Sequence, residues 1–266
     1  MQKFNNKTIW ITGASSGIGE ACAYSFAKEG ATLILTALEE KILENVRKKC
    51  LAEGSPKVCI LPFDLSNIEQ LDELAITALH QFGKIDILFN NAGISQRSDT
   101  LETNMTVFNK IMKVNFYAPV MLTRSVLPQM ILNGGGQLIV TTSIAGKFGF
   151  PLRSAYSSSK HALYGFFETI QAEYYRQNIR VTFVCPGRVR TNISFYALEK
   201  DGTQHNKMDE GQMAGITPKK AANKIVNAVY LKKREVLVGK KELIMAYIKR
   251  FFPGLAAKLA RNIKST

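Results

Sequence analysis

Tyr156 and Lys160 are the pair of side chains in this sequence best suited to proton transfer. They are four positions apart in a segment, 155 to about 177, whose pattern predicts a helix, so both should face the same side of it. A free tyrosine has a pKa of about 10, and a neighbouring cation favours the phenolate and lowers that pKa. The pair is therefore typical of a general acid/base that works near neutral pH. Because this spacing is also common on helix surfaces, its meaning depends on the elements around it.

A glycine-rich segment offers a place for a phosphate-containing cofactor. Residues 12–19 read TGASSGIG, with Gly13, Gly17 and Gly19 between the apolar run 8–12 and a helical pattern. Glycines let the backbone turn tightly and approach a pyrophosphate, which then sits at the N-terminus of the helix. The spacing G-x-x-x-G-x-G differs from the general G-x-G-x-x-G fingerprint. Between a strand and a helix, the segment predicts a phosphate loop for a dinucleotide.

The order of the elements predicts the fold that carries these residues. Short apolar runs at 8–12, 32–36, 57–61, 85–89, 137–141, 180–184 and 235–238 alternate with helical patterns that end near 28, 53, 82, 132, 177 and 231. Strands that are apolar throughout and alternate with helices indicate a parallel sheet covered on both faces. We therefore expect an α/β protein: a single-domain, Rossmann-type, doubly wound parallel sheet of about seven strands with helices on both faces.

Composition excludes several other classes of protein. The chain has 266 residues, of which 46% are hydrophobic and 21% charged, so it is neither disordered nor collagen-like. Its four cysteines lack a C-x-x-C pair and are expected to be reduced, with no metal site. No apolar run approaches the ~18 residues of a membrane-spanning helix, and no secretory signal is visible. We expect a cytoplasmic protein.

Further motifs follow in a fixed order along the chain. Asn90-Asn91-Ala92-Gly93 follows the fourth predicted strand, Ser143 follows the fifth, the Tyr156/Lys160 pair opens the next helix, and 186–191 follows the sixth strand. With the phosphate loop, this set resembles the short-chain dehydrogenase/reductase superfamily in its single-domain form, up to about residue 238. Residues 154–162 and Phe166-Phe167 look most like the dehydrogenase/reductase member 7 subgroup.

The resemblance implies a reaction and a role for four residues. It implies an NAD(P)-dependent oxidoreductase that moves a hydride between the cofactor and a carbonyl/alcohol carbon, with Tyr156 as the general acid/base. Lys160 would also hold the nicotinamide ribose, and Ser143 would orient the substrate oxygen. Asn115 would hold a water that relays protons to the lysine. Two alternatives stay open: epimerase or dehydratase chemistry with the same Tyr–Lys pair, and a nucleotide-binding protein without turnover.

The resemblance also implies a set of cofactor-binding residues. Asp64 would bond the adenine amine, although it would equally suit the cap of the following helix. Neither signal that separates NAD from NADP users is present, because Ala37 and Leu38 stand where an acid or an arginine is usual. The preference between the two cofactors is therefore open. The implied set is Gly13, Ser15, Ser16, Gly17, Ile18, Gly19, Leu38, Asp64, Leu65, Asn91, Ala92, Gly93, Tyr156, Lys160, Pro186, Gly187, Val189 and Thr191.

Pro119 lies four residues after Asn115 in the long predicted helix 104–132. Because proline has no N–H, the main-chain carbonyl of Asn115 should lose its helical partner. We expect either an opening that holds the relay water or a simple kink.

We divide the chain into a dinucleotide-binding and catalytic domain, 1–240, and a tail, 241–266. Within the domain, 192–216 is expected to be a substrate lid because ligands of this fold bind at the carboxyl ends of the strands. With Ile94, Phe148 and Phe150, this lid suggests a hydrophobic substrate. The alternative is that these side chains form core or dimer contacts.

The tail carries much of the chain's positive charge. Of a net charge of +14, residues 231–266 contribute ten Lys or Arg against two acids. Apolar residues spaced three and four apart predict a basic amphipathic helix, interrupted at Pro253-Gly254. It would lie on a membrane surface or pack on the protein as a lid or at a subunit interface. Nucleic acid is disfavoured, because the charge is concentrated on this apolar-striped segment.

The family resemblance implies a homodimer or homotetramer built on helices 104–132 and 155–177. Both have more apolar residues than one core-facing stripe requires. The residues concerned are Met112, Val114, Val120, Met121, Leu122, Leu127, Leu163, Phe166, Phe167 and Ile170.

Overall fold

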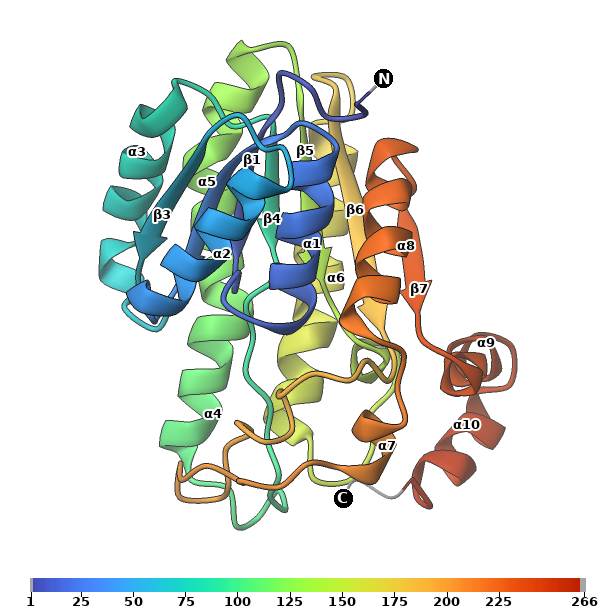
Figure 1. The fold of residues 1–266 in the computed structure, drawn as a ribbon. Helices are drawn as coiled ribbons and strands as arrows, with labels where there is room; N and C mark the ends of the chain where they lie inside the picture. The colour runs from blue at the N-terminus through green and yellow to red at the C-terminus, as the bar shows by residue number, and fades with distance from the viewer. Residues whose placement is uncertain (1, 264–266) are drawn as a thin grey trace.

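Seven parallel strands form one sheet in the order β3-β2-β1-β4-β5-β6-β7 (Figure 1). The computed structural model describes residues 2–263. The strands are β1 (Thr8–Thr12), β2 (Thr32–Ala37), β3 (Val58–Pro62), β4 (Ile87–Asn90), β5 (Gly136–Thr141), β6 (Ile179–Pro186) and β7 (Glu235–Val238). The predicted α/β class and seven-stranded doubly wound sheet are confirmed.

Helices connect the strands and cover both faces of the sheet. They are α1 (Gly17–Lys28), α2 (Glu40–Ala52), α3 (Leu71–Phe82), α4 (Met105–Met112), α5 (Ala118–Leu132), α6 (Ser154–Glu173), α7 (Glu210–Met213), α8 (Pro218–Tyr230), α9 (Ile244–Phe251) and α10 (Pro253–Ala260). Short 3-10 turns lie at Ile68–Gln70, Ile144–Gly146 and Lys241–Leu243. Every predicted helix exists within a few residues of its expected bounds, with one difference in the long helix.

The helix predicted over 104–132 is not one α-helix. Its α4 and α5 segments are separated by a π-helical turn, Lys113–Tyr117, in which the N–H of Ala118 bonds the carbonyl of Lys113. The expectation of a single regular helix is therefore wrong at this place. Pro119 lies at the start of α5, so its missing N–H falls where the helix widens. Whether a water sits at the Asn115 carbonyl stays a prediction.

The two faces of the sheet bury separate apolar layers. In β1, Ile9 and Ile11 pack under α1, α2 and α8, whereas Trp10 between them points to the other face, under α3, α5 and α6. Strand side chains alternate between faces, so a strand buried on both must be apolar at every position. This burial explains the continuous apolar runs in the sequence.

The sheet has a switch point at β1. From β1 the chain runs outward to β2 and β3, then returns to β4 on the other side of β1 and runs outward to β5, β6 and β7. Ligands of open α/β sheets bind at the carboxyl ends of the strands near such a point. The phosphate loop after β1 and the segments after β4, β5 and β6 all start at this end.

Residues 192–216 cross the carboxyl end of the sheet with little regular structure. Apart from the short helix α7, they are held by isolated bridges, including Gln96 with Leu198 and Val189 with Ile216.

The two tail helices, α9 and α10, follow β7 at the side of the molecule (Figure 1). Pro253 begins α10, which agrees with the predicted interruption. No residue of α9 is buried. Among residues 2–263, no helix is both long and apolar enough to cross a membrane.

Candidate active site

The loop after β1 can only be built with glycine at three positions. Gly13 and Gly17 have φ of +66° and +61°, which L side chains rarely adopt. A Cβ at Gly19 would lie 2.1 Å from the carbonyl oxygen of Gly13. The loop therefore brings backbone, not side chains, to the N-terminus of α1, where free N–H groups can bind a phosphate. This cradle fits the pyrophosphate of a dinucleotide.

Asn91 fixes the phosphate loop to the end of β4. Its Nδ2 donates to the carbonyl oxygens of Thr12 at 3.1 Å and Gly13 at 3.2 Å, and its Oδ1 accepts from Thr141 Oγ1 at 3.1 Å. The hydroxyl oxygen of Thr12 in turn accepts the N–H groups of Asn91 and Ala92. The Asn91 side chain is thus hydrogen-bonded to other protein groups, and the backbone of 91–93 is held close to Gly13.

Tyr156 and Lys160 lie on the first turns of α6, one turn apart, as the spacing predicts. Ser143 follows β5 and caps the short turn Ile144–Gly146, and its hydroxyl is near enough to Tyr156 to lower the pKa of that side chain. The Nζ of Lys160 is 5.9 Å from the centre of the Tyr156 ring. All three side chains are buried. The structure therefore brings Ser143, from the segment after β5, next to the two residues of α6.

Burial dominates the proton affinity of Lys160. The side chain is enclosed, and desolvation lowers the pKa of its amine to about 7. Its Nζ donates a hydrogen bond to the carbonyl of Thr141 at 2.8 Å. The amine is therefore poised to change its protonation state near neutral pH.

Burial also raises the pKa of Tyr156, against the opposing influence of its polar neighbours. The hydrogen bond from Ser143 and the positive charges of Arg153 and Arg97 lower that pKa, but they only partly offset burial. From the sequence we expected Lys160 to lower this pKa; the lowering contributions come instead from Ser143 and from two arginines that the sequence did not indicate. The available signal was the position of Arg153, three residues before Tyr156 and immediately before α6.

Asn115 is completely buried in the π-helical turn, next to Gly93 and Lys160. Its Oδ1 accepts the N–H of Ile94 at 2.9 Å, and its Nδ2 donates to the carbonyl of Ile94 at 2.9 Å and to Ser159 Oγ at 3.0 Å. A Cβ on Gly93 would lie 3.2 Å from both Asn115 Oδ1 and Lys160 Nζ. The side-chain amide is occupied, so a relay through Asn115 would use its main-chain carbonyl.

The remaining predicted cofactor residues surround the same end of the sheet. The methyl group of Thr191 would be 3.0 Å from a Cβ on Gly17. Val189 is buried, and the N–H of Gly187 bonds the carbonyl of Val238. Ser15, Ile18, Ala92 and Pro186 lie in the segments that follow β1 and β4 and at the end of β6.

Three predicted cofactor residues, Asp64, Leu65 and Leu38, have features that bear on their roles. Asp64 accepts the N–H of Ser66 at 2.9 Å, the kind of turn contact expected of its alternative role as a cap. Its neighbour Leu65 is buried in the core. Leu38 is 67% exposed just after β2, and Glu39, Glu40 and Lys41 beside it are also exposed. Nothing around Leu38 separates NAD from NADP.

The chain matches known proteins along most of its length. The family described as short chain dehydrogenase matches residues 7–201. A Drosophila melanogaster protein named dehydrogenase/reductase SDR family protein 7-like is 38% identical over 94% of this chain and 78% of its own. The chain belongs to the short-chain dehydrogenase family. This relative also agrees with the predicted member 7 subgroup.

Solved structures of short-chain dehydrogenases have the same fold. One from Burkholderia phymatum, in complex with NAD, superimposes with a TM-score of 0.82 over 100% of this chain and 99% of its own, at 24% identity. A metagenomic short-chain oxidoreductase in complex with NADP has a TM-score of 0.73 over 89% of this chain and 98% of its own, at 28% identity. Family membership makes the chain a dehydrogenase/reductase, and the residues at the carboxyl ends of its strands are the candidates for that activity.

Proposed function

We propose that this chain transfers a hydride between NAD or NADP and a carbonyl/alcohol carbon, with Tyr156 as the general acid/base. The observation that carries the proposal is the convergence of Ser143, Tyr156 and Lys160 beside Gly93. The bound nicotinamide cofactor supplies or accepts the hydride. Relatives that bind NAD and NADP agree with the cradle of Gly13, Gly17 and Gly19.

Each catalytic side chain has a task that follows from its contacts. The hydroxyl of Tyr156 gives a proton to the substrate oxygen during reduction and takes it during oxidation. Ser143, which lies near Tyr156, holds the same substrate oxygen. Lys160 holds the ribose of the cofactor, and its amine passes protons between Tyr156 and a water at Asn115. The pKa of about 7 of Lys160 suits that exchange at neutral pH.

The cofactor-binding residues that we propose are those implied by the sequence, with the phosphates on 13–19 and 191. The adenine lies near Asp64 and Leu65, and the nicotinamide near 91–93 and 186–189. A parallel fluorescence titration with NADH and NADPH tests this assignment. Binding of at least one is expected, and its affinity ranks the two cofactors. Binding of neither would favour a nucleotide-free role and contradict the proposal.

The substrate that we propose is a hydrophobic small molecule. Ile94 and Leu198 belong to an apolar cluster with Val107, Ile111 and Ala155, next to Tyr156, which supports an apolar wall on the substrate side. The rings of Phe148 and Phe150 lie 5.7 Å apart in the segment after Ser143. The lid that covers this wall is 192–216. Faster oxidation of NAD(P)H with an aromatic quinone than with a small sugar aldehyde is the expected result, and the reverse order would contradict it.

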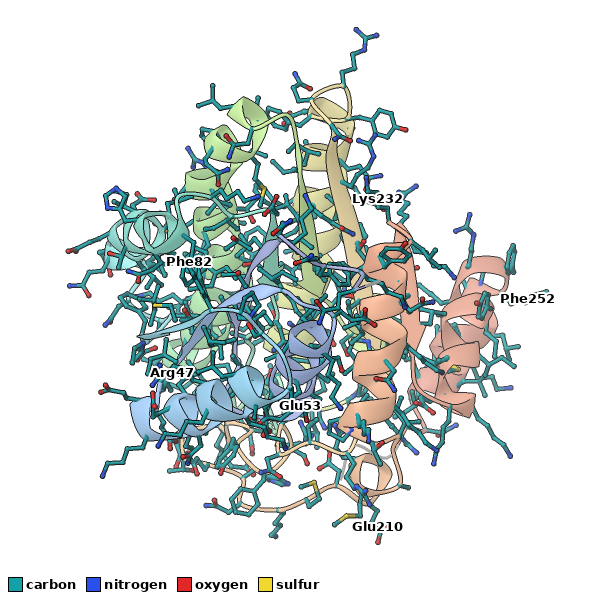
Figure 2. The ribbon with its side chains drawn as sticks, turned by 45° about the horizontal axis from the view of Figure 1, so that its top comes forward. Arg47, Glu53, Phe82, Glu210, Lys232 and Phe252 are labelled. Carbon is teal, nitrogen blue, oxygen red and sulfur yellow. The ribbon has the colours of Figure 1, made fainter. Side chains whose placement is uncertain are left out.

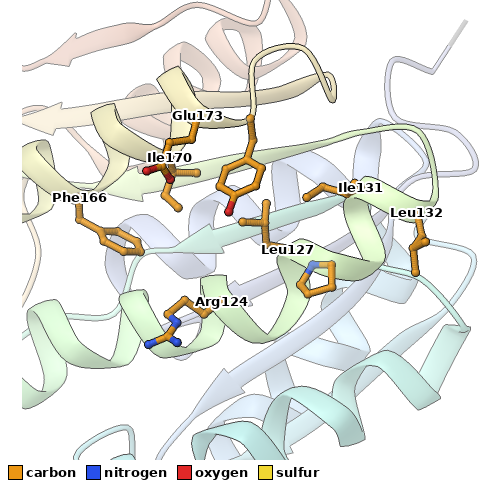
Figure 3. Close-up of a pocket in the computed structure, with 9 residues that line it drawn as sticks. Arg124, Leu127, Ile131, Leu132, Phe166, Ile170 and Glu173 are labelled. Carbon is orange, nitrogen blue, oxygen red and sulfur yellow. The ribbon is translucent and has the colours of Figure 1, made fainter.

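We propose that two copies associate through α5 and α6. A groove of about 620 Å³ runs between these helices (Figure 3). Leu132 at one end is 86% exposed. Of the residues expected at an interface, Val114, Leu122, Leu163 and Phe167 are instead buried in the protomer. Leu127 and Ile170 are each only 6% exposed, at the floor of the groove. The groove is lined by Arg124, Leu127, Pro128, Ile131, Leu132, Phe166, Ile170, Glu173 and Tyr174.

Sedimentation equilibrium of the full chain tests the association. A dimer or tetramer is expected, with Leu132→Asp shifting it toward monomer. Leu101→Asp, at a 96% exposed leucine outside the groove, is the control. A monomeric wild type would contradict this interface.

We propose that the tail holds the protein at an anionic membrane surface, at the cytoplasmic side. Ile244, Tyr247, Phe251 and Phe252 are more than half exposed, and Phe252 lies at the outer edge of the molecule (Figure 2). Lys249 and Arg250 lie between these side chains in the sequence, and Lys258 and Arg261 follow them. The buried residues of α10 are the small ones, Ala256 and Ala260, whereas Leu255 and Leu259 are 48% and 38% exposed. Exposed apolar groups flanked by cations are typical of a helix that lies on anionic lipid.

Vesicle sedimentation tests the membrane contact. The full chain should pellet with phosphatidylserine-containing vesicles and much less with phosphatidylcholine alone. Phe251→Asp with Phe252→Asp should abolish pelleting, whereas Leu101→Asp should not. Equal and negligible pelleting of wild type with both vesicles would leave the tail as a protein-packing segment.

A further inference from the structure

The carboxylate of Glu242 lies against the backbone of the segment that follows β6, although Glu242 belongs to the tail. Its Oε1 accepts the N–H of Arg188 at 2.7 Å and the N–H of Lys240 at 3.0 Å. Hydrogen bonds to an ionised carboxylate are stronger than those between neutral groups. Because the nicotinamide is proposed to lie near 186–189, a side chain from outside the catalytic domain 1–240 reaches the cofactor site.

Two glycines leave the space that the Glu242 carboxylate occupies. A Cβ on Gly187 would lie 2.5 Å from Glu242 Oε1, and a Cβ on Gly239 would lie 2.3 Å from the same atom. Real Cβ atoms essentially never come within 3.0 Å of another heavy atom, so a side chain at either position would displace the carboxylate. Glycine at both positions therefore allows the carboxylate to approach the backbone of 187–188 closely.

The neighbouring backbone groups of this segment are held by β7 and by the lid. The N–H of Gly187 donates to the carbonyl of Val238, at the end of β7, at 2.8 Å. The carbonyl of Arg188 accepts the N–H of Ile216, at the end of the lid, at 3.0 Å. The N–H of Arg188 lies between these two groups along the chain, and Glu242 is its partner. The carboxylate thus completes the contacts that fix the backbone just before the buried Val189.

The turn that carries Glu242 also contacts the lid. Lys240 Nζ donates to the carbonyl of Ala214, which follows α7, at 2.7 Å. Glu242 itself lies in the 3-10 turn Lys241–Leu243, which leads directly into α9. The start of the tail is therefore fixed to both the cofactor segment and the lid, whereas no residue of α9 beyond it is buried.

We propose that Glu242 is a positioning residue for the cofactor: its carboxylate fixes the backbone of Gly187 and Arg188 so that the segment 186–189 holds the nicotinamide half of NAD or NADP. This inference rests on the proposed cofactor site. The start of the tail is then part of that site, and the boundary at 240 divides one functional unit. Because the phosphate loop and Asp64 belong to other segments, the effect of Glu242 is confined to the nicotinamide half.

Two ligands separate the halves of the cofactor site in the full chain. One is the reduced cofactor, NADH or NADPH, whichever the wild type binds more tightly. The other is ADP-ribose, or its 2′-phosphate where NADPH is preferred, which has the adenine and the pyrophosphate but no nicotinamide. In calorimetric titrations, Glu242→Ala should bind the reduced cofactor about five- to tenfold more weakly, because the N–H of Arg188 loses its charged partner. Its affinity for the ADP-ribose ligand should stay within about twofold of the wild-type value.

Matched variants separate positioning from a general loosening of the fold. Glu242→Gln keeps an oxygen that can accept the same N–H groups, and it should bind the reduced cofactor within about threefold of the wild type. Glu73→Ala removes an exposed carboxylate from α3, on the other side of the molecule from the tail (Figure 1), and should bind both ligands as the wild type does. Glu242→Met keeps the length of the side chain without an acceptor, and it replaces Glu242→Ala if that variant does not fold, as judged by circular dichroism.

Three results in the variants would overturn the proposal. Equal weakening of both ligands in Glu242→Ala would indicate a general disturbance, and unchanged affinity for both would mean that the contact does not position the cofactor. Binding of the reduced cofactor by Glu242→Gln that is as weak as by Glu242→Ala would show that the acceptor oxygen does not hold the segment.

The wild-type titration separates failure of this inference from failure of the proposed function. If the wild type binds neither NADH nor NADPH, the proposed function and the role of Glu242 both fail. If the wild type binds a cofactor and Glu242→Ala binds it equally well, the proposed function stands and only the role of Glu242 is rejected.

Discussion

Adding one methyl group should have opposite effects at two helical glycines, Gly19 in α1 and Gly165 in α6. At Gly19 a Cβ would lie 2.1 Å from the Gly13 carbonyl oxygen and 2.5 Å from Asn91 Nδ2, whereas ordinary contacts begin at 3.4 Å. Alanine gains about 1 kcal/mol of helix propensity, but a forced fit against fixed backbone costs up to about 3 kcal/mol. Gly19→Ala should therefore lose about 2 kcal/mol of unfolding free energy, or about 4–8 °C in Tm.

Gly165→Ala is the matched control. Nothing lies within 4 Å of a Cβ at this exposed position, so the substitution should stabilise the protein by about 0.5–1 kcal/mol. Thermal unfolding followed by circular dichroism measures both variants. Titration with NADH and NADPH should show at least about tenfold weaker binding for Gly19→Ala, because the loop N–H groups are displaced from the pyrophosphate. Wild-type Tm and affinity in Gly19→Ala would refute the cradle as the phosphate site.

Three further substitutions test parts of the account. Asp86 accepts the N–H of Thr8 at 2.9 Å and faces Lys7 and Lys84; although burial alone would raise its pKa, these contacts hold the pKa of Asp86 below its usual value. In urea unfolding at pH 7, Asp86→Asn should have an unfolding free energy about 1–3 kcal/mol below that of the wild type. This difference should shrink as pH falls below about 4, because the wild-type carboxylate is then protonated. A difference that does not change with pH would contradict this. The Lys160 amine has a folded pKa of about 7, below its ordinary 10.5, so the unfolded chain binds more protons than the folded chain between these two pH values. The unfolding free energy of the wild type should therefore rise with pH in this range relative to that of Lys160→Met. A difference between the two proteins that does not change with pH would refute the burial argument. Asn115→Ala removes the partners of both backbone groups of Ile94 and should lower the unfolding free energy by about 2–4 kcal/mol. Asn109→Ala, at an exposed position, should change it by less than about 0.5 kcal/mol. Equal effects of the two substitutions would contradict the buried contacts.

The fold could be predicted from the sequence because each of its causes is local. A strand buried on both faces must be apolar throughout, and the 8–12 and 137–141 runs show that directly. The phosphate loop follows from glycines at positions where the backbone turns. The catalytic set could be proposed from the family resemblance. Ser143, Tyr156 and Lys160 also lie just after a strand or at the start of a helix, where this sheet brings them to one end, whereas Asn115 lies inside a predicted helix and depends on the resemblance alone.

Features that depend on packing between distant residues could not be predicted. Pro119 marks a missing N–H, but the local sequence does not decide between a kink and the observed π-helical turn. Arg97 and Asp209 are 112 residues apart, and no sequence pattern joins them. Similarly, apolar residues in helices 104–132 and 155–177 serve both the core and the groove, and only the three-dimensional contacts separate these uses.

The central claim is that Tyr156 transfers the proton that accompanies hydride transfer. The most direct measurement is NAD(P)H oxidation with phenanthrenequinone as the probe, for the wild type, Tyr156→Phe and Tyr164→Phe. Tyr164 is the matched control, because it lies further along α6 with its hydroxyl bonded to Thr142 and Glu235. We predict that Tyr156→Phe loses at least about 100-fold in kcat while it binds the cofactor as the wild type does, and that Tyr164→Phe keeps its turnover. Full activity in Tyr156→Phe would contradict the account.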